Sequence, residues 1–181
     1  SAFGALAKSK LNDPAASGAP EDQLRHPLET LIKELSDLTP VSRDAVNLVG
    51  EATLAGQGVR PDYAVSVHNA LVGFIEVKQP GKGCDPSKFK DKHDKEQWGK
   101  LKSLPNLLYT DGNGFSLWRS GEPQGKPVMF DGDIEASGVK LSAPDSLIAL
   151  ISDFLTWHPE PPSNPEKLAE VSAKLCRLLR D

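Results

Sequence analysis

The sequence has few cysteines and no long apolar segment. Cys84 and Cys176 are its only two cysteines among 181 residues, and they lie far apart. This count excludes a multi-cysteine zinc site and is more typical of a reduced cytoplasmic protein than of a disulfide-stapled secreted one. No apolar run approaches the ~20 residues that a membrane span needs, and residues 1–10 lack the basic start and apolar block of a signal peptide. We therefore expect a cytoplasmic protein with no membrane partner.

The chain also lacks a strong overall charge. Its formal net charge is -4, with 25% charged and 38% hydrophobic residues, which is ordinary for a soluble globular domain. The whole chain is therefore not a generic polyanion binder, and any nucleic-acid interface has to come from a local cluster of positive charge. The length is sufficient for one complete hydrophobic core.

Hydrophobic periodicity predicts an α/β order of elements. Residues 1–20, rich in Ala, Ser, Gly and Pro, predict a flexible lead-in. Leucines at 3- and 4-residue spacings predict a helix over 21–38. The patterns that follow predict three strands, a helix and two more strands, at 45–54, 63–67, 71–78, 87–104, 106–110 and 115–119. Beyond residue 120 the predicted elements are two helices flanking a proline-rich linker, at 145–157 and 164–180.

The third predicted strand ends in charged residues. Glu76 and Lys78 share a face of the strand because side chains alternate with a period of two. Asp62 enters the preceding strand directly after Pro61, and neighbouring strands lie about 4.8 Å apart, so the two carboxylates can share one ion. Mg²⁺ prefers such oxygen ligands and activates bound water for attack on phosphate. The alternative is an ordinary salt bridge at a strand end.

A third carboxylate has two candidates. Glu21 lies near the apolar stripe of the first helix, whereas Glu29 lies well away from it. Compensation of the helix dipole would also explain an acid at this position. Glu51, at the end of the first predicted strand, is a rival for the same role, and the sequence does not decide between them.

The predicted helix over 87–104 carries polar residues on its apolar stripe. His93 and Gln97 fall between Phe89 and Leu101 at steps of four. Buried polar groups need partners, and an adjacent active site would supply them; a partly exposed helix end is the alternative. We favour a role in the site for Gln97 over one for His93. Zinc binding by His93 is disfavoured because no second histidine lies at helical spacing.

Positive charge gathers in the same region. Residues 76–104 hold 8 Lys against 5 Asp and Glu, so this segment is basic in an acidic chain. A solvated helix with ion pairs four residues apart would have the same composition. The lysines that we predict to contact a phosphate backbone are Lys82, Lys88, Lys92, Lys95 and Lys100.

Taken together, these residues resemble the PD-(D/E)xK nuclease superfamily. Pro61-Asp62 and Glu76-Val77-Lys78 match its two signature motifs, and Gln97 resembles the glutamine of its helical third motif. Leu101 stands where many members have tyrosine, so the third motif is half present. A closer similarity, over residues 21–122, is to nuclease domains at the N-terminus of single-chain restriction-modification enzymes fused to an adenine DNA methyltransferase. It is carried by the stretches Glu21 to Arg25, Arg60 to Tyr63, Leu107 to Gly112 and Leu117 to Arg119.

The resemblance implies a three-layer α/β/α restriction-endonuclease-like core with a mixed central sheet at 21–122. Residues 123–181 would be an extension and helical connector to a downstream methyltransferase. Asp62, Glu76 and the Val77 backbone carbonyl would bind Mg²⁺, with Mn²⁺ as a substitute. Lys78 would act on the attacking water, and Glu21 and Gln97 would support the site.

The expected function is therefore a Mg²⁺-dependent endonuclease domain acting on duplex DNA, as the cleavage module of a restriction-modification or related defence enzyme. Cutting both strands would favour a dimer. Two alternatives remain open: a catalytically idle nuclease-like module that binds nucleic acid, and a repair or RNA-processing nuclease of the same fold. An idle cluster of buried charges would cost stability, which argues against the first alternative. The sequence predicts no recognition site.

Overall fold

The computed structural model describes residues 1–50, 60–159, 165, 166 and 169. Its sheet follows the order β1-β2-β3-β4-β5-β6, with β7 paired to β5. All neighbours are antiparallel except β3 and β4, which run parallel, so the predicted mixed central sheet is confirmed. The strands are Val46–Gly50 (β1), Tyr63–Val67 (β2), Ala70–Val77 (β3), Leu107–Thr110 (β4), Gly114–Arg119 (β5), Glu122–Pro123 (β6) and Val128–Met129 (β7).

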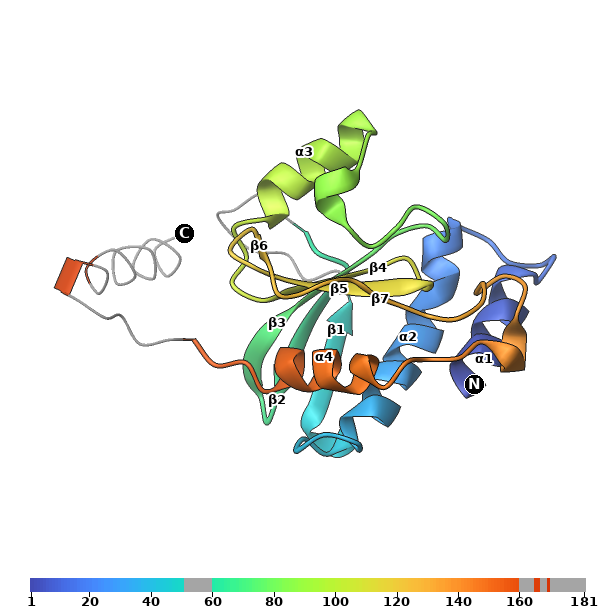
Figure 1. Cartoon of the computed structure of the whole chain (residues 1–181), viewed down its shortest axis with the longest axis horizontal. Helices are drawn as coiled ribbons and strands as arrows, with labels where there is room; N and C mark the ends of the chain where they lie inside the picture. The colour runs from blue at the N-terminus through green and yellow to red at the C-terminus, as the bar shows by residue number, and fades with distance from the viewer. Residues whose placement is uncertain (51–59, 160–164, 167–168, 170–181) are drawn as a thin grey trace.

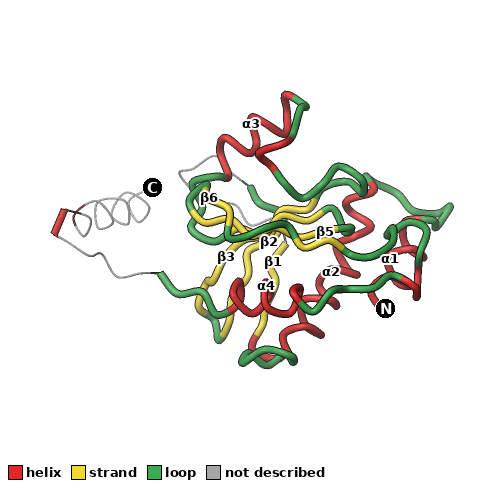
Figure 2. The backbone as a smooth tube through the Cα atoms, viewed as in Figure 1, coloured by secondary structure: helices red, strands yellow, loops and turns green. Residues whose placement is uncertain are grey.

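Helices cover both faces of this sheet, as Figures 1 and 2 show. Ala2–Leu11 (α1), Pro20–Ser36 (α2) and Ser146–Leu155 (α4) lie on one face, and Lys92–Leu101 (α3) lies on the other. This arrangement is the predicted three-layer α/β/α layout of a restriction-endonuclease-like core. None of the helices in the described part of the chain is long and apolar enough to cross a membrane.

The alternation of β2 to β5 sends side chains to two separate apolar clusters. The larger cluster packs strand residues such as Val65, Ile75 and Leu108 against α1, α2 and α4. The smaller cluster packs Phe74 and Tyr109, with a few others, beneath α3. The β2–β3 hairpin turns at His68 and Asn69, both with positive φ, as a tight two-residue connection requires.

Two predicted elements differ from the structure, and two others lie largely outside the residues that it describes. The prediction of a flexible lead-in is wrong for residues 2–11, which form α1. Phe3 and Ala7, one helical turn apart, are buried in the large core, and Leu11 packs against it. The helix predicted at 87–104 begins at Lys92. The predicted last helix at 164–180, and residues 51–54 of the first strand, lie largely outside the described residues.

Candidate active site

The end of β3 and the start of β2 bring Asp62 and Glu76 together. Asp62 directly precedes β2, whose Tyr63 is opposite Ile75 of β3. The Val77 backbone N–H donates to Asp62 Oδ2 at 2.8 Å, which fixes this carboxylate against β3. The charge of Asp62 is among the causes that raise the pKa of Glu76. The two strands thus place both predicted metal-binding carboxylates in one site.

Glu76 and Lys78 form a buried pair beneath α3. Only 2% of Glu76 and 7% of Lys78 is exposed, and Lys78 Nζ donates to Glu76 Oε1 at 2.9 Å. Gln97 of α3 joins both groups: its Nε2 donates to Glu76 Oε1 at 2.5 Å, and its Oε1 accepts from Lys78 Nζ. The prediction that Gln97 lies inside the cluster therefore agrees with the geometry.

Burial dominates the electrostatics of the carboxylates. Desolvation raises the pKa of Glu76 to about 7, and the neighbouring Asp62 charge adds to this effect while Lys78 opposes it. Desolvation also raises the pKa of Asp62, against the Val77 N–H bond and the Arg25 charge. Perturbed carboxyl groups of this kind cluster at functional sites.

In the described part of the chain, three buried side-chain atoms of this cluster have no hydrogen-bond partner: Glu76 Oε2, the Tyr109 hydroxyl oxygen and Asp94 Oδ2. Of these, Asp94 Oδ2 forms an ion pair with Lys82. Glu76 and Tyr109 are directly opposite each other on β3 and β4. A buried unpaired carboxylate oxygen is costly, and a divalent cation would satisfy it. The oxygen set of Asp62, Glu76 and the Val77 carbonyl suits the hard ligand preference of Mg²⁺. The residues present therefore fit a magnesium ion.

The other predicted residues lie at or near the edge of this cluster. Glu21, in the first turn of α2, is half-buried, and its charge contributes to the raised pKa of Lys82. Within the described chain, the hydrogen bonds and ion pairs of Asp62, Glu76 and Lys78 do not include Glu21. The α2 residue that reaches Asp62 is Arg25, whose Nη2 lies 3.3 Å from Asp62 Oδ1. Glu51 lies outside the described residues.

Besides Gln97, a second polar residue of α3, Asp94, points inward, and the sequence analysis did not identify it. For His93 the alternative of an exposed position near the helix start is confirmed, since His93 is exposed whereas Asp94 is 3% exposed. The Asp91 side chain caps α3 by accepting from the His93 and Asp94 N–H groups, so the helix begins later than predicted and its buried stripe starts at Asp94. The Asp91 cap was the available signal.

Asp91, His93 and Asp94 also form a group of potential ligands, with atoms within 4.8 Å of one another. This group could hold a metal ion. Its members are already engaged, however: Asp91 Oδ1 caps the helix, and Asp94 Oδ1 and Oδ2 lie 3.6 and 2.6 Å from the ammonium nitrogens of Lys78 and Lys82. In the predicted site, both Asp62 oxygens are also engaged, by Arg25 and the Val77 N–H, whereas Glu76 Oε2 is buried without a hydrogen-bond partner.

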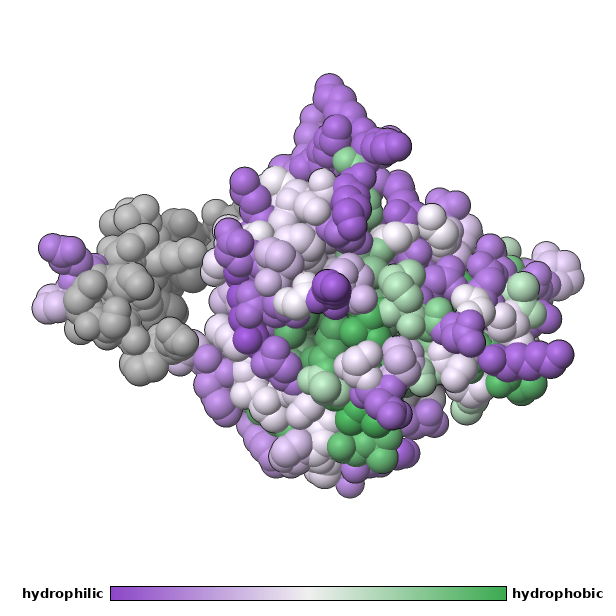
Figure 3. All heavy atoms as spheres, viewed as in Figure 1, coloured by the Kyte–Doolittle hydropathy of each residue, from purple (hydrophilic) through white to green (hydrophobic). Residues whose placement is uncertain are grey.

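The predicted DNA-binding lysines lie on or beside α3, where the surface is mainly hydrophilic (Figure 3). Lys95 and Lys100 are exposed. The side chains of Lys92 and Lys88 are 89% and 78% exposed and pair with Glu96 and Asp85. Lys82 is the one of the five that reaches the buried cluster, through Asp94. Contact of these lysines with DNA stays a prediction.

Comparison with known proteins yields a structural likeness. No family model matches the chain, and no curated protein matches it. Six chains of solved structures do match. One belongs to a cryo-EM structure of a DrdV–DNA complex, with a TM-score of 0.55 and 19% sequence identity, covering 87% of this chain and 13% of that chain. At this identity the likeness shows the fold alone, and this chain corresponds to a small part of that protein.

Proposed function

We propose that this chain is a Mg²⁺-dependent endonuclease domain of the PD-(D/E)xK type that hydrolyses phosphodiester bonds of duplex DNA. The observation that carries the proposal is the Asp62–Glu76–Lys78–Gln97 cluster, in which Glu76 and Lys78 are buried and Glu76 Oε2 has no hydrogen-bond partner. The likeness to a protein solved as a DNA complex supports DNA as the partner.

In this proposal, each residue has a chemical task. Asp62, Glu76 and the Val77 carbonyl would hold the metal ion, which activates water and neutralises charge on the phosphate. Lys78, held by Glu76 and Gln97, would orient the attacking water and stabilise the added negative charge. Gln97 keeps both side chains in place, because it donates to one and accepts from the other. The exposed lysines around α3 would bind the DNA backbone.

We further propose that the domain works as the cleavage module of a longer restriction-modification or defence enzyme, linked to a methyltransferase. The matched fold makes up 13% of the DrdV chain, so in that protein it is one part of a longer chain. Cleavage of both strands would then bring two such domains together as a dimer.

The test is cleavage of duplex DNA by the chain, with and without Mg²⁺, for the unaltered protein and for the variants Asp62→Ala and Lys78→Ala. We expect each substitution to lower the cleavage rate at least about a hundredfold. Lys140→Ala and Asp145→Ala replace exposed residues outside the site and should cleave normally. Circular dichroism would verify folding. Cleavage that survives both site substitutions, or that needs no divalent cation, would contradict the proposal.

A further inference from the structure

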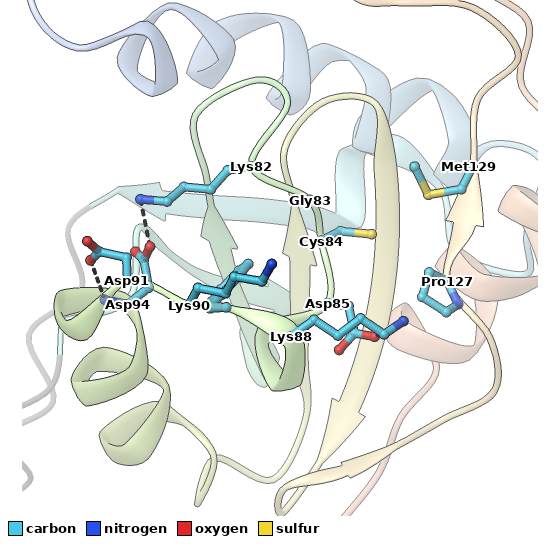
Figure 4. Close-up of a pocket in the computed structure, with 11 residues that line it drawn as sticks. Lys82, Gly83, Cys84, Asp85, Lys88, Lys90, Asp91, Asp94, Pro127 and Met129 are labelled. Atoms are coloured by element: carbon cyan, nitrogen blue, oxygen red, sulfur yellow. Dashed lines mark hydrogen bonds and ion pairs between the residues drawn. The ribbon is translucent and has the colours of Figure 1, made fainter.

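The buried carboxylate of Asp94 has no task in the proposed chemistry. It lies in the first turn of α3, is 3% exposed, and sits between two ammonium groups. Its Oδ1 is 3.6 Å from Lys78 Nζ and its Oδ2 is 2.6 Å from Lys82 Nζ. Figure 4 shows Lys82 reaching across to Asp94. Burial of a carboxylate is costly unless it is paired, so its position beside Lys78 calls for an explanation.

The start and the packing of helix α3 fix the position of the Asp94 side chain beside Lys78. The Asp91 cap fixes the start of α3, and Trp98 and Leu101, one and two turns further on, anchor the same side of the helix in the small apolar cluster. Trp98 packs edge-on against Tyr109 of β4 at a ring-centroid distance of 5.8 Å. The carboxylate is therefore held by a rigid helix on one side of Lys78, opposite the strand that carries Glu76.

This arrangement distributes the single charge of Lys78 among several acceptors. Its ammonium group has three protons and faces Glu76 Oε1, Gln97 Oε1 and Asp94 Oδ1. Without Asp94, Glu76 would be the one carboxylate of the described residues within ion-pair distance of Lys78. The ammonium group would then be drawn onto the carboxylate proposed to bind the metal. Lys82 offsets the extra negative charge that Asp94 brings.

We propose that Asp94 is a positioning residue, which holds the Lys78 ammonium group between helix α3 and strand β3 and links it to Lys82 at the rim of the neighbouring pocket. The effect of Asp94 on catalysis rests on the proposed function, whereas its effect on the position of Lys78 does not. The pocket has a volume of about 520 Å³, and Lys82, Phe89, Lys90 and Met129 are among its lining residues. Asp94 also lines this pocket, so its ion pairs with Lys82 and Lys78 connect the pocket to the proposed active site.

The first test is spectroscopic and needs no cleavage. Nuclear magnetic resonance of ¹⁵N-lysine-labelled protein should show a protected ammonium signal for Lys78, assigned by its loss in Lys78→Met. The isosteric variant Asp94→Asn should shift or broaden this signal through faster exchange with water. Asp153→Asn breaks a surface ion pair with Arg119 and should leave the signal unchanged. An unaltered Lys78 signal in folded Asp94→Asn would overturn the proposal.

The second test is kinetic. Asp94→Asn should lower kcat for DNA cleavage by about a hundredfold through misplacement of Lys78, with little change in KM, whereas Asp153→Asn should change neither. Asp94→Glu keeps the charge and should recover the Lys78 signal and most of the rate. If Asp94→Asn does not fold, a folded Asp94→Glu that lacks the Lys78 signal would overturn the proposal.

These results separate the two claims. Absence of cleavage in the unaltered protein would refute the nuclease, while the Lys78 signal would still decide the role of Asp94. A variant Asp94→Asn that loses Mg²⁺ binding but keeps the Lys78 signal would make Asp94 a metal ligand, and the positioning role would be wrong.

Discussion

The two faces of the central sheet bury different kinds of side chain. Against α1, α2 and α4 the strands bury a large apolar cluster of Val, Leu, Ile and Phe side chains. Against α3 the same strands bury a small aromatic-rich cluster beside Glu76, Lys78 and Asp94. Ile75 and Glu76 are neighbours in sequence yet belong to opposite faces. We infer that the apolar burial on one face stabilises the fold enough to offset the free-energy cost of burying charged groups on the other face.

The largest effect on stability should come from the apolar face. Ile151 of α4 is fully buried in the large cluster. We expect Ile151→Ala to lower the free energy of unfolding by about 2–5 kcal/mol, through lost burial and the cavity that remains. Urea denaturation would measure this change. Cleavage per folded molecule should persist, and a variant that stays stable but loses its activity would contradict the division between the faces.

The charged face should make stability depend on pH. The pKa of Glu76 is raised to about 7 from 4.5, so the folded state binds this proton more tightly than the unfolded state. Protonated Glu76 therefore stabilises the folded state. This contribution to the free energy of unfolding is complete below about pH 4.5 and is lost as the pH rises to about 7, and it amounts to roughly 3 kcal/mol. The raised pKa of Asp62 acts in the same direction. Thermal melts between pH 4 and 8.5 without divalent cations would measure this loss.

Mg²⁺ should offset the loss of stability that ionised Glu76 and Asp62 cause at high pH, because it would bind these carboxylates in the folded state and so stabilise that state. The rise in melting temperature on adding Mg²⁺ should therefore be larger at pH 8 than at pH 5.5. Glu76→Gln should flatten the pH dependence and reduce the response to Mg²⁺. Equal responses at both pH values would show that Glu76 does not bind the ion.

The smallest expected effect comes from two buried tyrosines, one on each face. The Tyr63 hydroxyl donates to Glu29 at 2.9 Å, whereas the Tyr109 hydroxyl is buried without a partner. Tyr63→Phe should cost about 1 kcal/mol of unfolding free energy, and Tyr109→Phe should be neutral or stabilising in the absence of metal. Urea denaturation of both variants would measure these changes. A larger loss for Tyr109→Phe would mean that its hydroxyl is paired.

The sequence predicted most of the fold and the residues that meet at the centre of the candidate site. The alternation of β3 and the Pro61-Asp62 start of β2 were enough to bring Asp62, Glu76 and Lys78 together, because strand geometry is regular over short distances. The hairpin between β2 and β3 was predictable from its short polar connection.

The features that the sequence did not predict each depend on how a helix packs in the fold. Asp94 was overlooked because its direction depends on the residue at which α3 begins, and Phe89 suggested an earlier start. The α1 helix was overlooked because its buried face consists of Phe3, Ala7 and a glycine, too little for a clear period. Arg25 was not expected to reach Asp62, since the contact depends on how α2 packs against the sheet. Tertiary packing decides each of these positions.

The most direct test of the account is where the metal ion binds. Isothermal calorimetry with Mg²⁺ at pH 8 should show one site per chain in the unaltered protein, no binding in Glu76→Gln, and unchanged binding in His93→Gln, whose residue belongs to the Asp91–His93–Asp94 group. Loss of binding in His93→Gln with retention in Glu76→Gln would place the metal on α3 and contradict the proposed active site.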